Sequence, residues 1–244
     1  MSELQQNQNE YQRSIELYND GIGRVDYVNH MGDDITVVNS ARVSFGVEKE
    51  ELDGKDKKLI NYLIKHRHTS TLEHNLITFR FCVPLYVRSQ HHRHRTWSYN
   101  EISRRYTDVN IKFYEPEAFR TQHKSNRQAS NAEELIDPPV EAIFQPGRAE
   151  GLVRLHHATS LSLFNQLIEA GVCREQARGV LPQNLYTEYY GTVNLSNLLK
   201  FIDLRTHEGA QWEIQKVAEA CLEIATDLFP VTVGAYRRIK ENEE

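Results

Sequence analysis

Apolar positions recur along the chain with two periods, which predict strands and helices in turn. Alternation over residues 77–83 puts Ile77, Phe79, Phe81 and Val83 on one face, so we expect a half-buried strand there. Pro84 suits the first turn of a helix that follows over residues 85–92. By the same reasoning, apolar or β-branched stretches predict further strands at 25–28, 35–38 and 185–194.

Apolar residues at three- and four-residue steps predict the remaining helices, at 58–64, 153–168, 173–181, 195–204 and 214–228. Gly171 is placed to end the second of these helices, and the third must end before Pro182. The last helix carries an apolar stripe formed by Ile214, Val217, Cys221, Ile224 and Leu228. Its spacing fits either packing within the chain or a subunit seam.

The length of 244 residues is sufficient for one large domain with a sizeable core. The order of strands and helices predicts a mixed α/β (α+β) fold with a twisted central sheet flanked by helices. We expect one domain over residues 1–244, with residues 1–20 as a mobile N-terminal extension. Residues 121–149 are polar and contain Pro138, Pro139 and Pro146, so we expect a loop or a mobile lid.

Composition and charge restrict the class of protein. With 39% hydrophobic residues, no run as long as a membrane span and a polar N-terminus, the sequence predicts a cytoplasmic protein without a membrane partner. The net charge of −5 disfavours bulk nucleic-acid binding. The three cysteines form no CxxC pair, which fits a reducing compartment.

The run RHRTWSYNEISRRY at residues 93–106 is the most unusual stretch. Such a mixture can bind nucleic acid, a metal ion or a small phosphorylated molecule. His91, His92 and His94 are close in sequence, but adjacent helical residues point about 100° apart. No carboxylate stands at a matching spacing, so we expect no metal site and assign His91 and His92 to a solvated or hydrogen-bonded helix end.

A cysteine nucleophile is the second alternative. Cys82 lies on a predicted strand and Cys221 on the apolar helical stripe, where inert buried thiols are usual. Cys173 stands near a predicted helix start, yet no histidine nearby would orient it. We expect Cys173 to be a small buried residue.

The third interpretation is a nucleotide site. Arginine offers a rigid fork of donors that matches phosphate oxygens. The arginines of the run, Arg93, Arg95, Arg104 and Arg105, cannot all be neutralised by Glu101. A second group, formed by Arg174, Arg178 and Arg205, flanks the predicted strand at 185–194. For Arg178 and Arg205 an ordinary ion pair with Glu175, Glu188 or Asp203 remains the alternative.

The arrangement of RHR, seven residues and then Ser103 resembles the signature of the flavin-dependent thymidylate synthases. Two further blocks resemble that family: KHRHTSTLEH at 65–74, and the segment from CREQARGVL to EIQ at 173–215. The resemblance extends from about Asp34 to Pro230.

The resemblance implies a homotetramer with shared active sites, in which reductive methylation turns dUMP into dTMP. Methylenetetrahydrofolate would give the carbon, FAD would carry hydride and NADPH would reduce the flavin. The catalytic residues implied are Arg205, Ser103 and Arg93. The implied dUMP group is Gln90, Arg93, Glu101, Ser103, Arg104, Arg105, Arg178 and Arg205. The implied FAD group is His68, Ser70, Glu73, Arg93, His94, Arg95, Asn100, Glu101, Asn194 and Lys200, with His68 also near the folate.

The sequence departs from the family pattern at a few positions. Ser196, Lys200, Thr69 and Gly209 stand where some relatives have other residues, which affects individual FAD contacts and leaves the dUMP group intact. The alternative from another class is a nucleotide- or nucleic-acid-binding regulator that uses the basic run without catalysis. Steep salt dependence and a preference for oligonucleotides would indicate that regulator.

Overall fold

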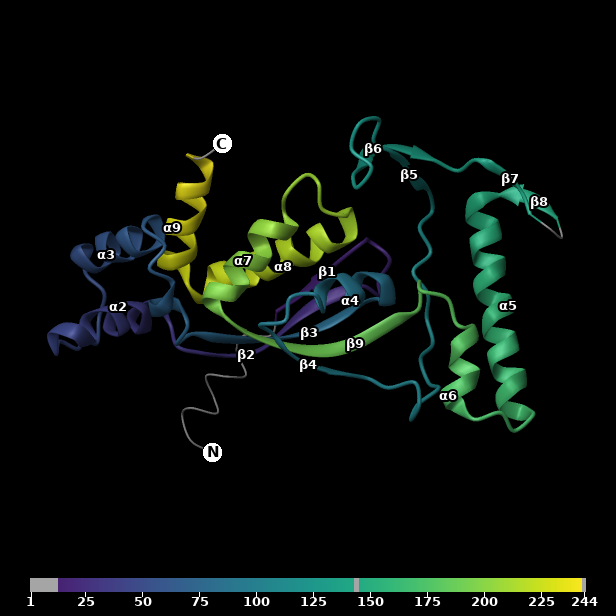
Figure 1. The fold of residues 1–244 in the computed structure, drawn as a ribbon, viewed down its shortest axis with the longest axis horizontal. Helices are drawn as coiled ribbons and strands as arrows, with labels where there is room; N and C mark the ends of the chain where they lie inside the picture. The colour runs from purple at the N-terminus through teal and green to yellow at the C-terminus, as the bar shows by residue number, and fades with distance from the viewer. Residues whose placement is uncertain (1–12, 143–144, 243–244) are drawn as a thin grey trace.

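A computed structural model describes residues 13–142 and 145–242 and is centred on one antiparallel sheet (Figure 1). In this described part of the chain the sheet has five strands in the order β1-β2-β3-β9-β4. Their bounds are Ser14–Glu16, Arg24–Met31, Leu76–Pro84, Tyr186–Asn194 and Ser98–Glu101, respectively. The longest pairing joins β3 to β9, from Leu76 opposite Asn194 to Pro84 opposite Tyr186. The mixed α/β fold and the strands expected at 25–28, 77–83 and 185–194 are confirmed.

Helices α4 (Leu85–His91), α7 (Leu195–Arg205) and α8 (Trp212–Leu228) pack on the apolar face of this sheet. The sheet contributes Phe79 and Phe81, both fully buried. The α8 stripe is also fully buried at Ile214, Val217 and Cys221 within a single chain. The sequence left open whether this stripe packs within the chain or forms a subunit seam, and the structure shows that it packs within the chain.

The opposite face of the sheet carries charged side chains. Arg24 forms ion pairs with Asp26 at 3.1 Å and with Glu188 at 3.5 Å, and Arg80 also pairs with Glu188. Because side chains alternate along a strand, the apolar residues of β2, β3 and β9 face the helices and these charges face away. The sheet is consequently amphipathic, as the period-two pattern predicted.

One end of the molecule is formed by α2 (Asp34–Arg42), α3 (Gly54–Lys65) and α9 (Pro230–Glu241), with the short helices η1 (Val43–Phe45) and η2 (Thr69–Leu72). The expected strand at 35–38 is wrong, because these residues lie in α2. Asp33 caps that helix by accepting a hydrogen bond from Thr36 N at 2.9 Å. A four-residue apolar run fits a strand or a helix, and the cap selects the helix.

Helix α9 was not predicted, and a carboxylate from α2 holds its beginning. Asp34 is buried and accepts hydrogen bonds from Val231 N at 2.8 Å, Thr232 N at 2.9 Å and Thr232 Oγ1 at 2.5 Å. These backbone groups lack partners inside their own helix. The segment that resembles the family runs from about Asp34 to Pro230, so Asp34 connects the two ends of that segment in space.

The other end contains α5 (Ala149–Glu169), α6 (Arg174–Ala177) and the short helix η3 (Arg178–Val180). Gly171, with a φ of 87°, follows the end of α5 as expected. The region expected to be a loop or a mobile lid, residues 121–149, contains two hairpins, which pair β5 (Phe119–Gln122) with β6 (Ser130–Ile136) and β7 (Pro139–Glu141) with β8 (Pro146–Arg148). Proline is tolerated here because each hairpin has only edge strands. The mobile lid stays a prediction.

Part of the expected N-terminal extension belongs to the central sheet. Strand β1 begins at Ser14 and pairs with β2, whereas residues 1–12 of the expected extension lie outside the described residues. Within residues 13–142 and 145–242, none of the helices combines the length and the apolar character needed to span a bilayer.

Candidate active site

A cavity of about 550 Å³ lies between β4, β9 and the α6–η3 segment. Four residues of the implied dUMP group line it, namely Glu101, Ser103, Arg104 and Arg178. They come from segments more than 70 positions apart in sequence, because the fold brings the end of β4 beside α6 and η3. The cavity therefore joins two of the motif blocks.

Glu101 is fixed from two sides. Its Oε1 accepts a hydrogen bond from Arg88 Nε at 3.1 Å and another from Thr187 Oγ1 at 2.7 Å. Sequence reasoning missed both partners: Thr187 is 86 positions from Glu101, and Arg88 lies 13 positions before it, outside the basic run. The only available signal was that Arg88 lies on the predicted helix that leads into the basic run. Because Arg88 pairs with Glu101, the arginines of the run keep their charge for another partner.

The arginines around this cavity have different environments. Arg104 donates to Val109 O at 2.6 Å and to Asn110 O at 3.4 Å, and burial lowers the pKa of its guanidinium. Arg178 is exposed, and no carboxylate pairs with it among residues 13–142 and 145–242. Thus Glu175 and Glu188 do not neutralise Arg178, and its fork of donors remains available for an anion.

Ser103 accepts a hydrogen bond from the backbone N–H of Arg105 at 3.2 Å. In the described part of the chain no imidazole or carboxylate contacts its hydroxyl, so a catalytic base is missing. This environment fits a binding role for Ser103 and gives no support to a nucleophilic one. Arg105 itself is exposed beside the cavity.

A second cluster contains Gln90, His94 and Arg205. Arg205, the last residue of α7, donates from Nε to His94 Nε2 at 3.0 Å and from Nη2 to Gln90 O at 3.4 Å. Asp203, the alternative partner, pairs with Lys240 instead. Burial, followed by the nearby Arg205 charge, lowers the pKa of His94 to about 4. His94 is therefore neutral at pH 7 and accepts at Nε2.

The other two histidines support the structure. His91 is fully buried and shares a hydrogen bond of 2.8 Å with Tyr189 OH. His92 stacks on Tyr99 with ring centroids 4.1 Å apart. The interpretation of His91 as a hydrogen-bonded residue at a helix end is confirmed, and the desolvation of its ring lowers its pKa well below the ordinary value.

The remaining residues of the implied FAD group gather where η2 meets the beginning of α7. His68, Ser70 and Glu73 belong to or flank η2. Asn194 caps α7 by accepting from Asn197 N at 2.9 Å, and Lys200 lies one turn further along the same helix. Leu195 N donates to Asn75 O at 2.9 Å and thereby fixes the two segments side by side.

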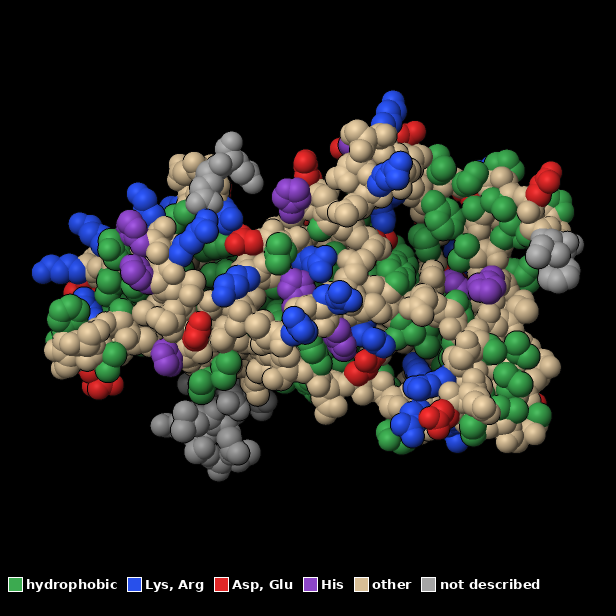
Figure 2. Space-filling view, viewed as in Figure 1, with side chains coloured by type: hydrophobic (Ala, Val, Ile, Leu, Met, Phe, Trp, Pro, Cys, Tyr) green, Lys and Arg blue, Asp and Glu red, His purple; other side chains and the backbone are tan. Residues whose placement is uncertain are grey.

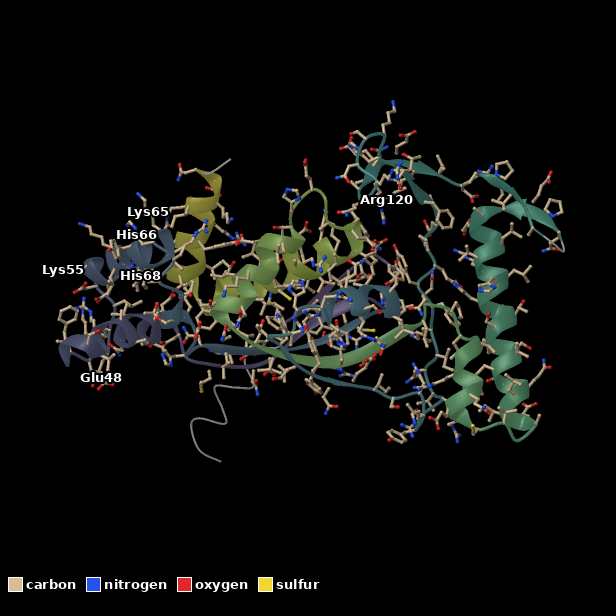
Figure 3. The ribbon with its side chains drawn as sticks, in the orientation of Figure 1. Glu48, Lys55, Lys65, His66, His68 and Arg120 are labelled. Atoms are coloured by element: carbon tan, nitrogen blue, oxygen red, sulfur yellow. The ribbon has the colours of Figure 1, made fainter. Side chains whose placement is uncertain are left out.

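The backbone before η2 positions His68. Arg67 has a φ of 55°, a left-handed conformation that is uncommon for residues other than glycine. This turn lets His68 N donate back to Leu63 O at 2.9 Å and ends α3. Figure 3 shows His68 at the end of the molecule formed by α3.

The implied residues thus form separate groups within one chain. Among the described residues, the cavity lining includes Glu101, Ser103, Arg104 and Arg178 but neither Gln90 nor Arg205. Arg93 and Arg95 are exposed after α4, and Lys and Arg side chains gather over this region (Figure 2). Asn100 lies on the charged face of the sheet, in a hollow with Arg80 and Tyr190.

The cysteines lie in dissimilar surroundings. Cys82 and Cys221 are buried as expected, and burial raises the pKa of the Cys82 thiol to about 11. Cys173 is exposed, so its assignment as a buried residue is wrong. It precedes the four-residue helix α6 at the surface, and no apolar cluster includes it.

Comparison with solved structures identifies the class of fold first. The chain is 33% identical to the UMP/dUMP methylase PolB from Streptomyces cacaoi bound with 5-Br dUMP. The TM-score is 0.74, over 92% of this chain and 97% of that one. The fold is therefore that of the nucleotide methylases.

Comparison of sequences identifies the family. Residues 26–231 match the family model described as thymidylate synthase complementing protein. Flavin-dependent thymidylate synthases from Thermus thermophilus and Thermotoga neapolitana are 43% and 38% identical, each over 88% of this chain and over 75% and 90% of their own lengths. The chain belongs to the family of flavin-dependent thymidylate synthases.

Proposed function

We propose that the protein converts dUMP into dTMP, using methylenetetrahydrofolate as the carbon donor, FAD as the hydride carrier and NADPH as the reductant. The observation that carries this proposal is the cavity in which Glu101, Ser103, Arg104 and Arg178 converge. Family membership supports the same reaction. Three cysteines without a CxxC pair fit the cytoplasm, where we place the reaction.

The arginine-lined cavity would bind the phosphate of dUMP. Arg178 and Arg105 offer charged donors, while the Ser103 hydroxyl adds a neutral one. Glu101, held by Arg88 and Thr187, keeps one carboxylate oxygen for a sugar hydroxyl or a base N–H. The cavity thereby supplies both cationic and acceptor groups to one nucleotide.

The reaction needs negative charge on the pyrimidine ring to be stabilised, because carbon 5 of uracil is a poor nucleophile. Arg205 would do this electrostatically. Its partner His94 is neutral, so the guanidinium charge is not cancelled by a carboxylate. A cysteine is not required in this scheme, in agreement with the raised thiol pKa of Cys82.

The donors near η2 and α7 fit a flavin dinucleotide. Arg93, Arg95 and Lys200 are exposed cations that suit two phosphates, and the N-terminus of the 11-residue helix α7 favours negative charge. Asn75 Oδ1 and Ser196 Oγ are buried without a hydrogen-bond partner in the described residues, as is expected beside a bound polar group. When bound, the flavin supplies hydride transfer.

We also propose a homotetramer with shared sites. The implied dUMP residues form two groups that do not line one cavity, so a complete dUMP site would take Arg178 from one copy and Arg205 from another. Exposed Arg178 and Arg105 are consistent with a surface that a second copy completes.

A visible absorption spectrum tests the cofactor and the substrate together. We expect a flavin spectrum that bleaches anaerobically with NADPH, and at a different rate when dUMP is present. A protein that takes up no added FAD and prefers oligonucleotides with steep salt dependence would instead be the non-catalytic regulator.

Two substitutions test the proposed roles of Arg178 and Arg205 in binding dUMP. Arg178→Ala and Arg205→Ala should each lower kcat/KM for dUMP by about 100-fold, because each removes a charged donor from the nucleotide. Arg148→Ala is the matched control, since Arg148 pairs with Asp137 on another part of the surface. Full activity in either site variant would remove the role proposed for that residue.

A further inference from the structure

We propose that Arg120 is a positioning residue for the Arg205 cluster and acts on it through Glu213. The proposal rests on the function proposed above and assigns a task to the hairpin region that follows the basic run. Arg120 lies on β5, next to the beginning of α8 and away from His68 at the opposite end (Figure 3). None of the motif blocks includes it.

The Arg120 side chain is held over the first turn of α8. Its Nη2 donates to Glu213 Oε1 at 2.5 Å, and its guanidinium carbon lies 4.8 Å from the centre of the Trp212 ring. Arg120 is thus fixed by a carboxylate and an aromatic face.

Glu213 passes this contact on to α4. Its second oxygen, Oε2, accepts from Gln211 Nε2 at 2.9 Å, and Gln211 Oε1 accepts from the side-chain amide of Gln90. Burial and the nearby Glu213 charge raise the pKa of Tyr86, which lies one helical turn before Gln90. The Glu213 carboxylate is therefore linked to α4 through Gln211 and Gln90.

Gln90 leads directly to the proposed catalytic arginine. The backbone carbonyl of Gln90 accepts from Arg205 Nη2 at 3.4 Å, while Arg205 Nε bonds to His94 on the turn after α4. A rotation or shift of α4 would move both acceptors of Arg205. The orientation of that guanidinium consequently depends on where Glu213 holds α4.

The negative charge of Glu213 explains why Arg120 is needed to hold α4 in place. The Glu213 side chain is 5% exposed, and Arg120 is the cation that pairs with it among the described residues. A buried carboxylate without a counterion either takes up a proton or draws in water, since the unpaired charge is strongly disfavoured. Either response changes the acceptor that Glu213 offers to Gln211.

The test uses full-length protein with four substitutions. Arg120→Met removes the charge and keeps the apolar stem, and Arg120→Lys restores the charge without the fork. Glu213→Gln keeps an acceptor for Gln211 and removes the need for a counterion. Arg148→Met is the matched control, because Arg148 also lies on a hairpin strand, β8, and pairs with one carboxylate, Asp137, at 2.9 Å.

Hydrogen exchange measured by mass spectrometry provides the first readout. We expect Arg120→Met to speed exchange in peptides that cover residues 86–95 and 203–209, with no change in the central strands β3 and β9. Arg148→Met should leave the first two peptides unchanged. Uniformly faster exchange would show a general loss of stability and would overturn the positioning role.

Steady-state kinetics provide the second readout. Arg120→Met should lower kcat for dTMP formation by about tenfold or more, since a small displacement of a catalytic group has effects of that size. Arg120→Lys should recover part of the loss. In a Glu213→Gln background the same Arg120→Met change should have little further effect, because Arg120 acts through that carboxylate.

The outcomes separate this inference from the proposed function. A wild-type protein that makes no dTMP would contradict the function, while the exchange comparison would still decide the role of Arg120. Active wild-type protein with unchanged exchange and kcat in Arg120→Met would overturn the inference alone. An equal effect of Arg120→Met with and without Glu213→Gln would overturn the path through Glu213.

Discussion

Three histidines within four positions end in three different environments. His91 lies in the core against Tyr189, His92 stacks on Tyr99, and His94 accepts from Arg205. Their angular spacing on a helix was readable from the sequence, and the assignment of His91 to a hydrogen-bonded helix end was correct. The partners were not readable, because Tyr189 and Arg205 come from elements about 100 residues away.

The depressed pKa of His94 makes a prediction about acid stability. Its folded-state pKa is about 4, against an ordinary value of 6.5. Between these two pH values the His94 imidazole is therefore protonated in the unfolded chain and neutral in the folded chain. Stability should therefore be complete above pH 6.5 and fall as the pH is lowered towards 4. Buried His91 acts in the same direction.

Denaturant unfolding of the wild type and of His94→Asn at pH 7 and pH 5 measures this effect. The loss of unfolding free energy between the two pH values should be smaller in the variant. An identical loss in both proteins would show that His94 does not titrate as described.

Elements with a long, regular pattern were predictable, and short or interrupted ones were not. The alternation in β3 and the helical spacing of α3, α5 and α7 gave the right elements. Residues 35–38 are a short apolar run whose helical state depends on the Asp33 cap. The strands of the hairpins at 119–148 are short and β6 and β7 are largely exposed, so no alternating apolar face marks them in the sequence.

The contact between α2 and α9 yields a prediction for neighbouring aspartates. Asp34→Ala should lower the unfolding free energy by about 3 kcal/mol, because three donors at the start of α9 lose a buried acceptor. Asp33→Ala removes only the exposed cap of α2 and should cost about 1 kcal/mol. Equal losses, measured by denaturant unfolding, would contradict the special role of Asp34.

At the scale of the whole molecule, the implied residues are assembled in part by the chain and in part by its proposed oligomer. The motif blocks supplied Glu101, Ser103, Arg104 and Arg178 as one set, and the fold brings these four into one cavity. The resemblance places Gln90 and Arg205 in the same dUMP group, but these two residues lie in another cluster. A sequence records which residues belong together in a family and does not record which copy contributes each of them.

Mixing two impaired variants tests the shared site. Arg178→Ala and Arg205→Ala chains, each about 100-fold impaired alone, should regain dTMP formation when they assemble together, since some sites then combine an intact Arg205 with an intact Arg178. With random assembly at equal amounts, about one quarter of the sites should be intact.

The matched control pairs two variants of one cluster. Gln90→Ala mixed with Arg205→Ala should recover nothing, because both residues come from the same copy of the site. No recovery in the first mixture would show that each chain builds its site alone. Recovery in the control would show that Gln90 and Arg205 come from different copies, against the scheme proposed here.

The pairing of β3 with β9 also governs how the protein reaches its fold. More than 100 residues separate the paired positions, from Leu76 and Asn194 to Pro84 and Tyr186. During synthesis, therefore, Phe79 and Phe81 leave the ribosome long before the strand and helices that cover them. Non-local pairing of this kind slows folding and prolongs the exposure of apolar surface. The nascent chain should consequently be most prone to aggregate after β3 has emerged and before β9 does.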